Sequence, residues 1–318
     1  MYETIDLIVL PRQTLNQEDF LAKPQCSIAL DGVVRGGPFR DEETRHVNFD
    51  HHDGVDREIT MSTCKQVFMA IKGGLFKSYR QNGKPFAYVY VNDSDQDTSL
   101  SVFELENNKM LEGSQSNPLF NRLLELTDKL DITGGAFPLN LSDKLMRQHS
   151  WIFQPYSELR KSGALATANH QVIQDNIESI MLRIKEYLMN RGGEAELDIR
   201  HKILYDSPYG YRIIHEIGGN DARYYLFGNG MDAFVSLVAE RPDGKKVWSI
   251  GRRSGYIPFP VQELYDEYNK AEGLTRENGW NGSTLVGGSS RFFGSILNDK
   301  DLRYLTDEFL EKKYGKKV

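Results

Sequence analysis

The sequence predicts an α/β protein, with a mainly parallel sheet and flanking helices, plus a smaller C-terminal α/β domain joined to it by a long helix. In the N-terminal part, short apolar runs alternate with segments of helical pattern, which favours a parallel sheet. Further along, one long amphipathic segment precedes a region rich in strand and turn residues. The chain has 318 residues. Domains of about 150 residues make two the expected number.

Four apolar runs in the N-terminal part are typical of buried strands. They are residues 5–10, 26–34, 46–50 and 86–92. After the third run, a helix is expected to begin at Ser62, whose hydroxyl can cap it, and to end at Gly73-Gly74. After the fourth run, residues 99–108 have a helical pattern.

The longest predicted helix lies within residues 167–190, where isoleucines recur every three or four positions and charges occupy the opposite face. Beyond it the composition shifts towards strands and turns. We therefore expect one domain over residues 1–150, a connector containing the long helix over 151–194, and a second domain over 195–318.

Composition and charge exclude several classes of protein. Lysine and arginine total 39 against 45 acidic residues, a net charge of −6, which argues against long duplex nucleic acid and allows a small phosphorylated ligand. Cys26 and Cys64 are too few for a disulfide framework or a cysteine-type zinc site. The sequence shows neither an apolar run of about 20 residues nor a signal-peptide pattern. We expect a cytoplasmic protein without membrane association.

Acidic residues and histidines follow three of the predicted strands. They are Asp31, then Asp50, His51 and His52, and finally Asp95 and Asp97. In parallel sheets ligands gather at the carboxyl ends of strands, and carboxylates with imidazoles suit ions such as Mn²⁺. Taken singly, each group has a plainer interpretation: an Asp-Gly turn, a polar loop with solvent-facing histidines, or a solvated acidic turn.

Five of these side chains supply enough ligands for two divalent metal ions: Asp31, Asp50, His51, Asp95 and Asp97. Two ions about 4 Å apart can hold the attacking and leaving oxygens of a phosphoryl displacement. We expect Mn²⁺, with Mg²⁺ or Co²⁺ as alternatives. An EF-hand is excluded, because the glycine and the distal glutamate required at fixed offsets are missing from Asp93 onward.

Three segments follow one another in the chain: SIALDGVVRGG, which contains Asp31; Asp50-His51-His52; and Ser62-Thr63-Cys64 at the start of a helix. In order and spacing they resemble the second and third motifs of the DHH phosphoesterase superfamily. The C-terminal segments SLVAERPDGKKVWSIGRRS and WNGSTLVGGSSRFFGSIL are similar to the DHH-associated substrate domain. There, a strand carrying Ser-x-Arg-Ser precedes a glycine-rich turn.

The first departure from the family pattern concerns its opening strand, which normally ends in Asp-x-Asp. Here that strand leads into Pro11-Arg12-Gln13. Asp95-Gln96-Asp97 looks like the missing motif displaced along the chain, and Asp131 is then the candidate for the fourth motif. Alternatively, the Asp95–Asp97 cluster is the fourth motif and the first has been lost, which would leave one metal or none.

The second departure is the glycine-rich turn, in which the family often places a histidine. This chain has Gly287-Gly288-Ser289 there and no histidine. Small residues let backbone N–H groups approach an anion, and arginines add bidentate contacts to phosphate. The predicted substrate-binding residues are therefore Arg252, Ser254, Gly287, Gly288, Ser289 and Arg291. The alternative is a tight turn with solvated arginines.

The resemblance implies that residues 1–150 bind metal and catalyse, and that residues 195–318 close over the cleft and bind substrate. We expect hydrolysis of a small phosphorylated nucleotide or short phosphodiester by a water that two metal ions activate. His52 would be the catalytic residue that protonates the leaving group. The alternatives are a non-catalytic nucleotide-binding protein on the same scaffold, a single-strand exonuclease, and an unrelated enzyme. Any of these could form a homodimer.

Overall fold

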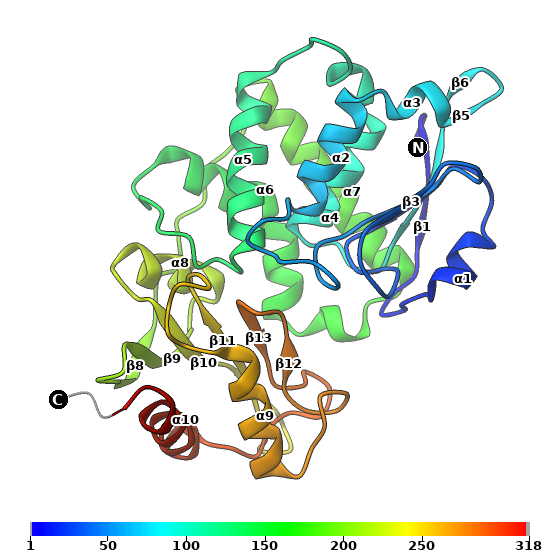
Figure 1. The fold of residues 1–318 in the computed structure, drawn as a ribbon. Coiled ribbons are helices and arrows are strands. Elements are labelled where there is room, and N and C mark those ends of the chain that lie inside the picture. The colour runs from blue at the N-terminus through cyan, green and yellow to red at the C-terminus, as the bar shows by residue number, and fades with distance from the viewer. Residues whose placement is uncertain (1, 316–318) are drawn as a thin grey trace. The chain divides into compact units, whose positions relative to one another are not determined.

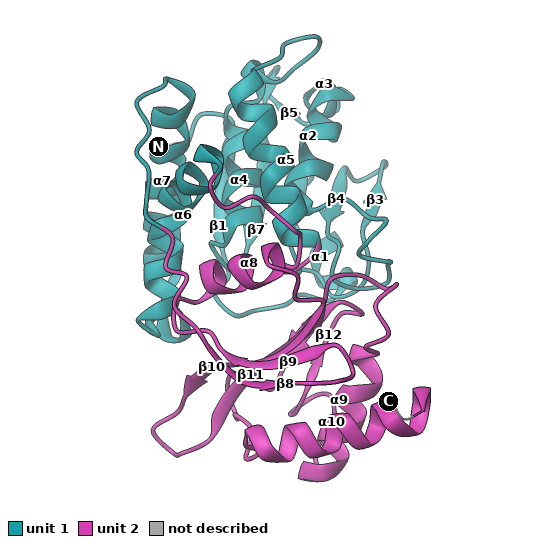
Figure 2. Cartoon of the chain, turned by 90° about the vertical axis from the view of Figure 1, so that its left-hand side faces the viewer, with its two compact units in different colours: residues 1–132, 143–196 teal, residues 133–142, 197–318 magenta. Residues whose placement is uncertain are grey.

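The computed structural model describes residues 2–315 of the chain. Figure 2 shows its two compact units in separate colours. Unit 1 comprises Met1–Ile132 and Asp143–Glu196, and unit 2 comprises Thr133–Ser142 and Leu197–Val318. Each unit contains a sheet and helices, which confirms the predicted α/β class.

The sheet of unit 1 has five strands in the order β1-β7-β2-β4-β3. They are β1 (Ile5–Val9), β2 (Ser27–Leu30), β3 (Phe39–Asp41), β4 (His46–Phe49) and β7 (Ala87–Val91). All neighbours are parallel except the edge strand β3, which is antiparallel to β4. A separate hairpin joins β5 (Arg80–Gln81) to β6 (Lys84–Pro85). The mainly parallel sheet therefore matches the sequence-based expectation.

Helices of unit 1 cover mostly one face of this sheet (Figure 1). They are α2 (Thr63–Lys72), α3 (Leu75–Ser78), α4 (Gln96–Glu106), α5 (Pro118–Ile132), α6 (Lys144–Lys161) and α7 (His170–Leu188), with the 3₁₀ turns η1 (Asn108–Met110) and η2 (Ala164–Thr167). In β7, Ala87, Val89 and Val91 join the core beneath these helices. Tyr90 alternates to the other face, where the short α1 (Gln17–Leu21) contributes Phe20.

Two of the predicted helices appear close to their expected bounds. Ser62 caps α2 by accepting a hydrogen bond from the backbone N–H of Lys65, and the helix ends at Gly73. The helix expected as a connector, α7, belongs to unit 1, where Ile173 and its periodic partners are part of the core. The amphipathic stripe of α7 therefore packs within the first unit rather than lying between two domains.

Unit 2 contains a mixed sheet of six strands in the order β12-β13-β11-β10-β9-β8. Its elements are β8 (Lys202–Asp206), β9 (Tyr211–His215), α8 (Asn220–Gly228), β10 (Ala233–Glu240), β11 (Lys246–Arg252), α9 (Val261–Glu272), β12 (Asn281–Gly282), β13 (Val286–Gly288) and α10 (Asp299–Tyr314). Only β9 and β10 are parallel neighbours. One core forms with α9 and α10, and a smaller one forms with α8 and Ala136.

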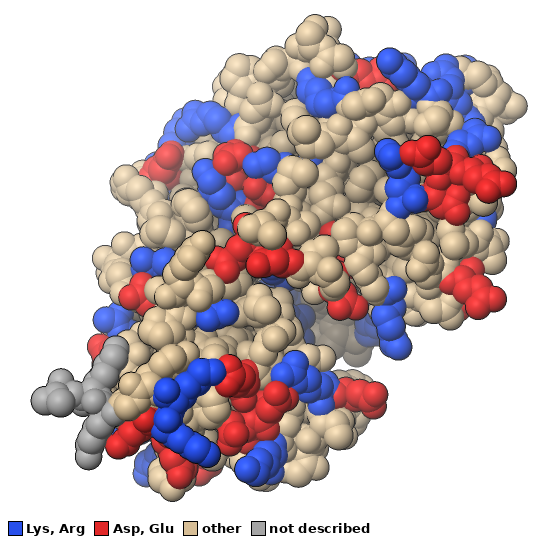
Figure 3. Space-filling model, viewed as in Figure 1, with Lys and Arg blue, Asp and Glu red and all other residues tan. Residues whose placement is uncertain are grey.

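Surface charge and helix hydropathy both agree with the composition. On the face drawn in Figure 3, acidic and basic side chains are interspersed and no large area is purely basic. Within residues 2–315, no helix is both long and apolar enough to cross a lipid bilayer.

Candidate metal centre

The centre forms at the carboxyl ends of three adjacent parallel strands in unit 1. In the register of the sheet, Leu30 at the end of β2 pairs with Phe49 at the end of β4, and Ala29 pairs with Tyr90 of β7. The residues that follow these strands therefore emerge at the same edge. This topology brings together side chains that are far apart in the sequence, as the alternating strand and helix pattern predicted.

His51 is the central side chain of this edge. It is 1% exposed, and its Nε2 atom lies 2.8 Å from Oδ2 of Asp131, 3.6 Å from Oδ1 of Asp31 and 3.8 Å from Oδ2 of Asp97. Despite the short distance to Asp131, neither ring nitrogen makes a hydrogen bond of acceptable geometry within residues 2–315. A buried ring nitrogen surrounded by three carboxylates and left without a hydrogen bond is the environment of a metal ligand.

Asp97 links the centre to the first turn of α2. Its carboxylate accepts 2.7 Å hydrogen bonds from the backbone N–H groups of Thr63 and Cys64, which have no partner inside the helix. The partial positive charge of the helix N-terminus further favours a carboxylate there. Ser62 caps the same helix, so the segment opened by Ser62 also fixes the direction of Asp97.

Asp31 is held at the centre in an unusual backbone conformation. Its φ angle is 54°, in the left-handed region that aspartate tolerates better than most residues. Thr63 and Thr98 donate side-chain hydrogen bonds to its two carboxylate oxygens at 3.1 and 3.3 Å. Burial opposes ionisation, but His52 and His51 outweigh it and hold the pKa of Asp31 below its usual range. The carboxylate is thus ionised and available as a ligand.

Asp131 reaches the centre from the end of a helix rather than from a strand. It lies in the last turn of α5, and the buried Arg57 donates hydrogen bonds to the backbone carbonyls of Asp131 and Ile132 and contacts the Asp131 carboxylate. From the sequence, Asp131 was a candidate ligand only on the interpretation that it is the fourth motif of the family. Arg57 was missed, since it stands alone in a charged loop without any recognisable pattern.

The side chains form two overlapping groups, each able to hold a metal ion. One group is Asp31, His51 and His52, and the other is His51, Asp97 and Asp131. Within each group, one ligand atom from every residue lies within 4.8 Å of the others. The carboxylate and imidazole donors of either group suit a divalent ion of the Mn²⁺ type, and because His51 Nε2 can bind only one ion, carboxylates would have to supply the second. The residues present therefore fit the metals that the sequence predicts.

Asp50 and His52 form a hydrogen-bonded pair beside these groups. Oδ1 of Asp50 accepts bonds from the backbone N–H groups of His51 and His52 and, at 2.9 Å, from Nδ1 of His52. The His52 side chain is 43% exposed, whereas Asp50 is buried. The structure includes Asp50 in neither ligand group. A metal-binding role for Asp50 stays a prediction, while its observed role is to orient His52.

Asp95 lies at the same edge and caps the following helix. Its side chain accepts a hydrogen bond from the backbone N–H of Thr98 at 2.9 Å, which begins α4. Burial raises the pKa of Asp95 well above its usual value, and the negative charges of Asp31, Asp93 and Asp131 add to the effect. Asp95 belongs to neither ligand group, so its predicted role as a ligand is also left open.

The metal-free protein is expected to lose stability as the pH rises from 5 to 8. Burial, followed by the charges of Asp131 and Asp31, raises the pKa of Asp97 to about 7. A carboxyl group whose pKa is raised by folding stabilises the fold below its unfolded pKa of about 4, and this contribution is lost as the pH rises through the folded value. A bound cation would replace the proton, so Mn²⁺ should remove most of the loss.

Thermal unfolding at several pH values, in EDTA and in Mn²⁺, measures this effect. Asp97→Asn is the matched variant, because it cannot ionise, and its melting temperature in EDTA should depend less on pH. A wild-type melting temperature in EDTA that stays constant or rises over this range would contradict the assigned electrostatics.

In unit 2, the predicted substrate-binding arginines differ in their surroundings. Arg252 donates from Nε to the carbonyl of Thr284, and from one Nη to the carbonyls of Gly255 and Ile257. These bonds hold two loops together and occupy part of the guanidinium. Arg291 is exposed. Binding of phosphate by either arginine stays a prediction.

The small residues of the predicted glycine-rich turn are part of the sheet. Gly287 and Gly288 lie in β13, and a Cβ atom on Gly287 would overlap the hydroxyl of Tyr265. Ser289 accepts a hydrogen bond from the backbone N–H of Trp248 at 2.9 Å. Close packing of the sheet therefore accounts for these glycines without a ligand, and Ser254 lies just beyond β11, where its hydroxyl caps a turn.

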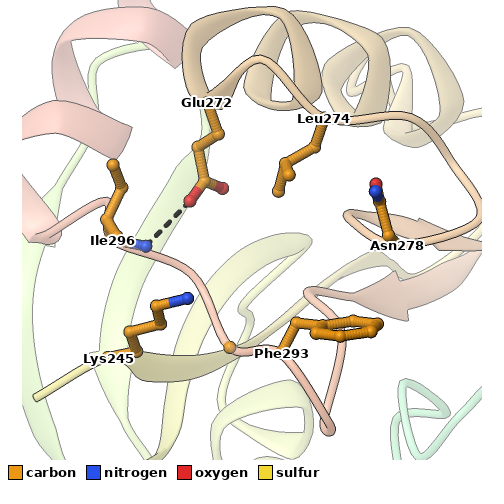
Figure 4. A pocket seen from close by; sticks show the side chains of 7 residues that line it. Lys245, Glu272, Leu274, Asn278, Phe293 and Ile296 are labelled. Carbon is orange, nitrogen blue, oxygen red and sulfur yellow. Dashed lines mark hydrogen bonds between the residues drawn. The ribbon is translucent and has the colours of Figure 1, made fainter. Parts of the chain in front are cut away.

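A cavity of about 230 Å³ lies elsewhere in unit 2 (Figure 4). Its lining residues are Lys245, Glu272, Leu274, Asn278, Phe293, Gly294 and Ile296. The Glu272 carboxylate accepts hydrogen bonds from the Trp280 indole, the Ser295 hydroxyl and the backbone N–H of Ile296, at 2.7 to 2.8 Å. The protein's own donors thus already satisfy its one acidic group, and none of the predicted site residues lines it.

The sequence matches no family model and none of the curated proteins.

Proposed function

We propose that the chain is a divergent DHH-type phosphoesterase that hydrolyses a small phosphorylated nucleotide or a short phosphodiester with two divalent metal ions, preferably Mn²⁺. The observation that carries this proposal is the orphaned imidazole of His51, which lies within 4 Å of carboxylates from three separate segments of the chain. Buried carboxylates crowd together in this way only when a proton or a cation separates them.

In such a site, some residues of unit 1 would bind the metal ions and others would hold these ligands in position. His51, Asp97 and Asp131 would hold one ion, and the carboxylate of Asp31 would hold the other, with His52 beside it as the proton donor. When bound, the ions supply a water of lowered pKa and neutralise charge on the phosphoryl group. Thr63, through its hydroxyl and its backbone N–H, keeps Asp31 and Asp97 in their ligand positions.

His52 is proposed to protonate the leaving oxygen from its Nε2 atom. Partial desolvation opposes protonation of the ring, but the charge of Asp31 and the hydrogen bond to Asp50 outweigh it and raise the pKa of His52. Because Asp50 engages Nδ1, the proton on Nε2 is the one available to a substrate. The partial exposure of the ring is consistent with such access.

The charge of the chain and its two cysteines bear on the size of the substrate and on the cellular compartment. The net charge of −6 and the mixed charges of Figure 3 favour a small substrate over long duplexes. Cys26 and Cys64 are both free thiols, which supports the expected reducing, cytoplasmic compartment. The role of unit 2 in substrate binding is inferred from the sequence resemblance alone.

Metal loading is expected to give two Mn²⁺ ions per chain and to stabilise the protein. At a hundredfold excess over the dissociation constant, a single site adds about 2.7 kcal/mol to the free energy of unfolding. Isothermal titration with Mn²⁺, elemental analysis after loading and thermal unfolding with and without EDTA measure these quantities. Binding of less than one ion per chain would contradict the proposed centre.

Hydrolysis assays then separate the alternative functions. The Mn²⁺-loaded chain should cleave bis(p-nitrophenyl) phosphate and a dinucleotide. Faster turnover of long single strands than of dinucleotides would instead indicate an exonuclease. Two bound ions with nucleotide binding but no turnover would indicate a non-catalytic binding protein.

A further inference from the structure

Arg57 is a buried cation at the edge of the acidic centre. The residue is 8% exposed. Its Nε atom donates to the carbonyl of Ile132 at 3.1 Å, and its Nη2 atom donates to the carbonyl of Asp131 at 2.8 Å and to its carboxylate at 3.4 Å. An arginine placed in this way needs an explanation, because a fixed positive charge weakens the binding of divalent cations nearby.

Arg57 holds the end of α5 and the side chain of Asp131 in place. Asp131 and Ile132 end α5, where unpaired carbonyls and the negative end of the helix dipole disfavour a carboxylate. The guanidinium satisfies two of these carbonyls and offsets the local negative charge. It thereby fixes Asp131 with its Oδ2 atom 2.8 Å from Nε2 of His51.

One guanidinium nitrogen of Arg57, Nη1, takes no part in these bonds. Nη1 makes no hydrogen bond within residues 2–315, and it is not one of the fully buried polar atoms that lack a partner, so part of its surface stays accessible. The charge of Arg57 acts on Asp31, Asp131, His51 and His52.

We propose that Arg57 has two roles at the centre: it clamps Asp131 in place, and through Nη1 it binds a phosphoryl oxygen of the substrate. This inference rests on the proposed function and extends it by a residue that recognises the oxyanion. A guanidinium is suited to the task, because it stays charged and can donate to the protein and to the ligand from different nitrogens. It also explains why a positive charge is retained beside the metal ligands.

The test compares Arg57→Ala and Arg57→Lys with wild type, using Mn²⁺ alone and inorganic phosphate as probes. Arg40→Ala is the control, because Arg40 is a solvent-exposed arginine of the same unit, paired with the nearby Glu42. For Arg57→Ala we expect two Mn²⁺ ions per chain, bound more weakly. We also expect a Ki for phosphate that is at least about tenfold higher, the loss of one charged hydrogen bond.

Arg57→Lys keeps the positive charge but loses the several N–H donors of the planar guanidinium. The Ki of this variant for phosphate should therefore lie between those of wild type and Arg57→Ala. Arg57→Lys also serves as the test if the alanine variant does not fold. A Ki within twofold of wild type in both variants would overturn the phosphate role. Full loss of Mn²⁺ binding in both variants would overturn it as well, by showing that Arg57 acts only through Asp131. Wild-type protein that binds no Mn²⁺ would instead refute the proposed function before any variant is compared.

Discussion

Replacing His51 by alanine is expected to abolish Mn²⁺-dependent hydrolysis, with a fall in kcat/KM of at least about a thousandfold. His51 belongs to both candidate ligand groups, so its loss removes the imidazole ligand from the middle of the three carboxylates. The remaining carboxylates of Asp31, Asp97 and Asp131 would then repel one another without the imidazole between them. Steady-state kinetics on bis(p-nitrophenyl) phosphate, together with Mn²⁺ titration, measure the effect.

His170→Ala is the matched control, since it makes the same substitution at an exposed position at the start of α7 in the same unit. It should keep both the metal stoichiometry and the activity of wild type. If His51→Ala retained more than a tenth of wild-type activity with two bound ions, His51 would not be a metal ligand and the proposed centre would be wrong.

Asp97→Ala is expected to remove most of the stabilisation that Mn²⁺ gives to the fold. Asp97 accepts two backbone hydrogen bonds at the start of α2, and charged hydrogen bonds of this kind contribute about 1.5–3 kcal/mol each. In EDTA, part of this loss is offset, because the repulsion between Asp97 and the charges of Asp31 and Asp131 disappears. With Mn²⁺, no such relief exists and one ligand is missing.

Urea unfolding of wild type and variant, each in EDTA and in Mn²⁺, separates the two effects. The increase in unfolding free energy caused by Mn²⁺ should fall below about 1 kcal/mol in Asp97→Ala. Asp143→Ala is the control, because Asp143 caps α6 in the same unit and its loss should cost about 1 kcal/mol in either condition. An equal Mn²⁺ effect in wild type and Asp97→Ala would show that Asp97 only caps α2.

The sequence predicted the positions of site residues best where these residues lie at or just beyond the end of a strand. Asp31 directly follows β2 and His51 lies two residues beyond β4, and parallel pairing forces such residues to one edge of the sheet. Asp97 follows β7 by the same logic, and the capping serine at position 62 marked the start of α2. These features depend on local patterns, so they could be predicted without knowledge of the rest of the fold.

Roles that depend on contacts between distant segments could not be predicted in this way. Asp131 meets His51 from the end of a helix that begins at Pro118, far beyond His51 in the chain, as the 2.8 Å distance between their side chains shows. Arg57 contacts a helix end that lies 75 residues further along the chain. No periodicity or motif in the sequence records such a contact.

The path of residues 133–142 limits how this chain can be divided. The backbone leaves unit 1 after Ile132, contributes this short segment to unit 2, and returns at Asp143. Ala136 of the segment packs with Phe227 and Phe234 in the smaller core of unit 2. A fragment that begins at Leu197 would therefore lack part of its own interior. A fusion or truncation that is meant to carry unit 2 must therefore include residues 133–142. During synthesis, this segment is made first and meets the rest of unit 2 only after the helices of residues 143–196 have been made.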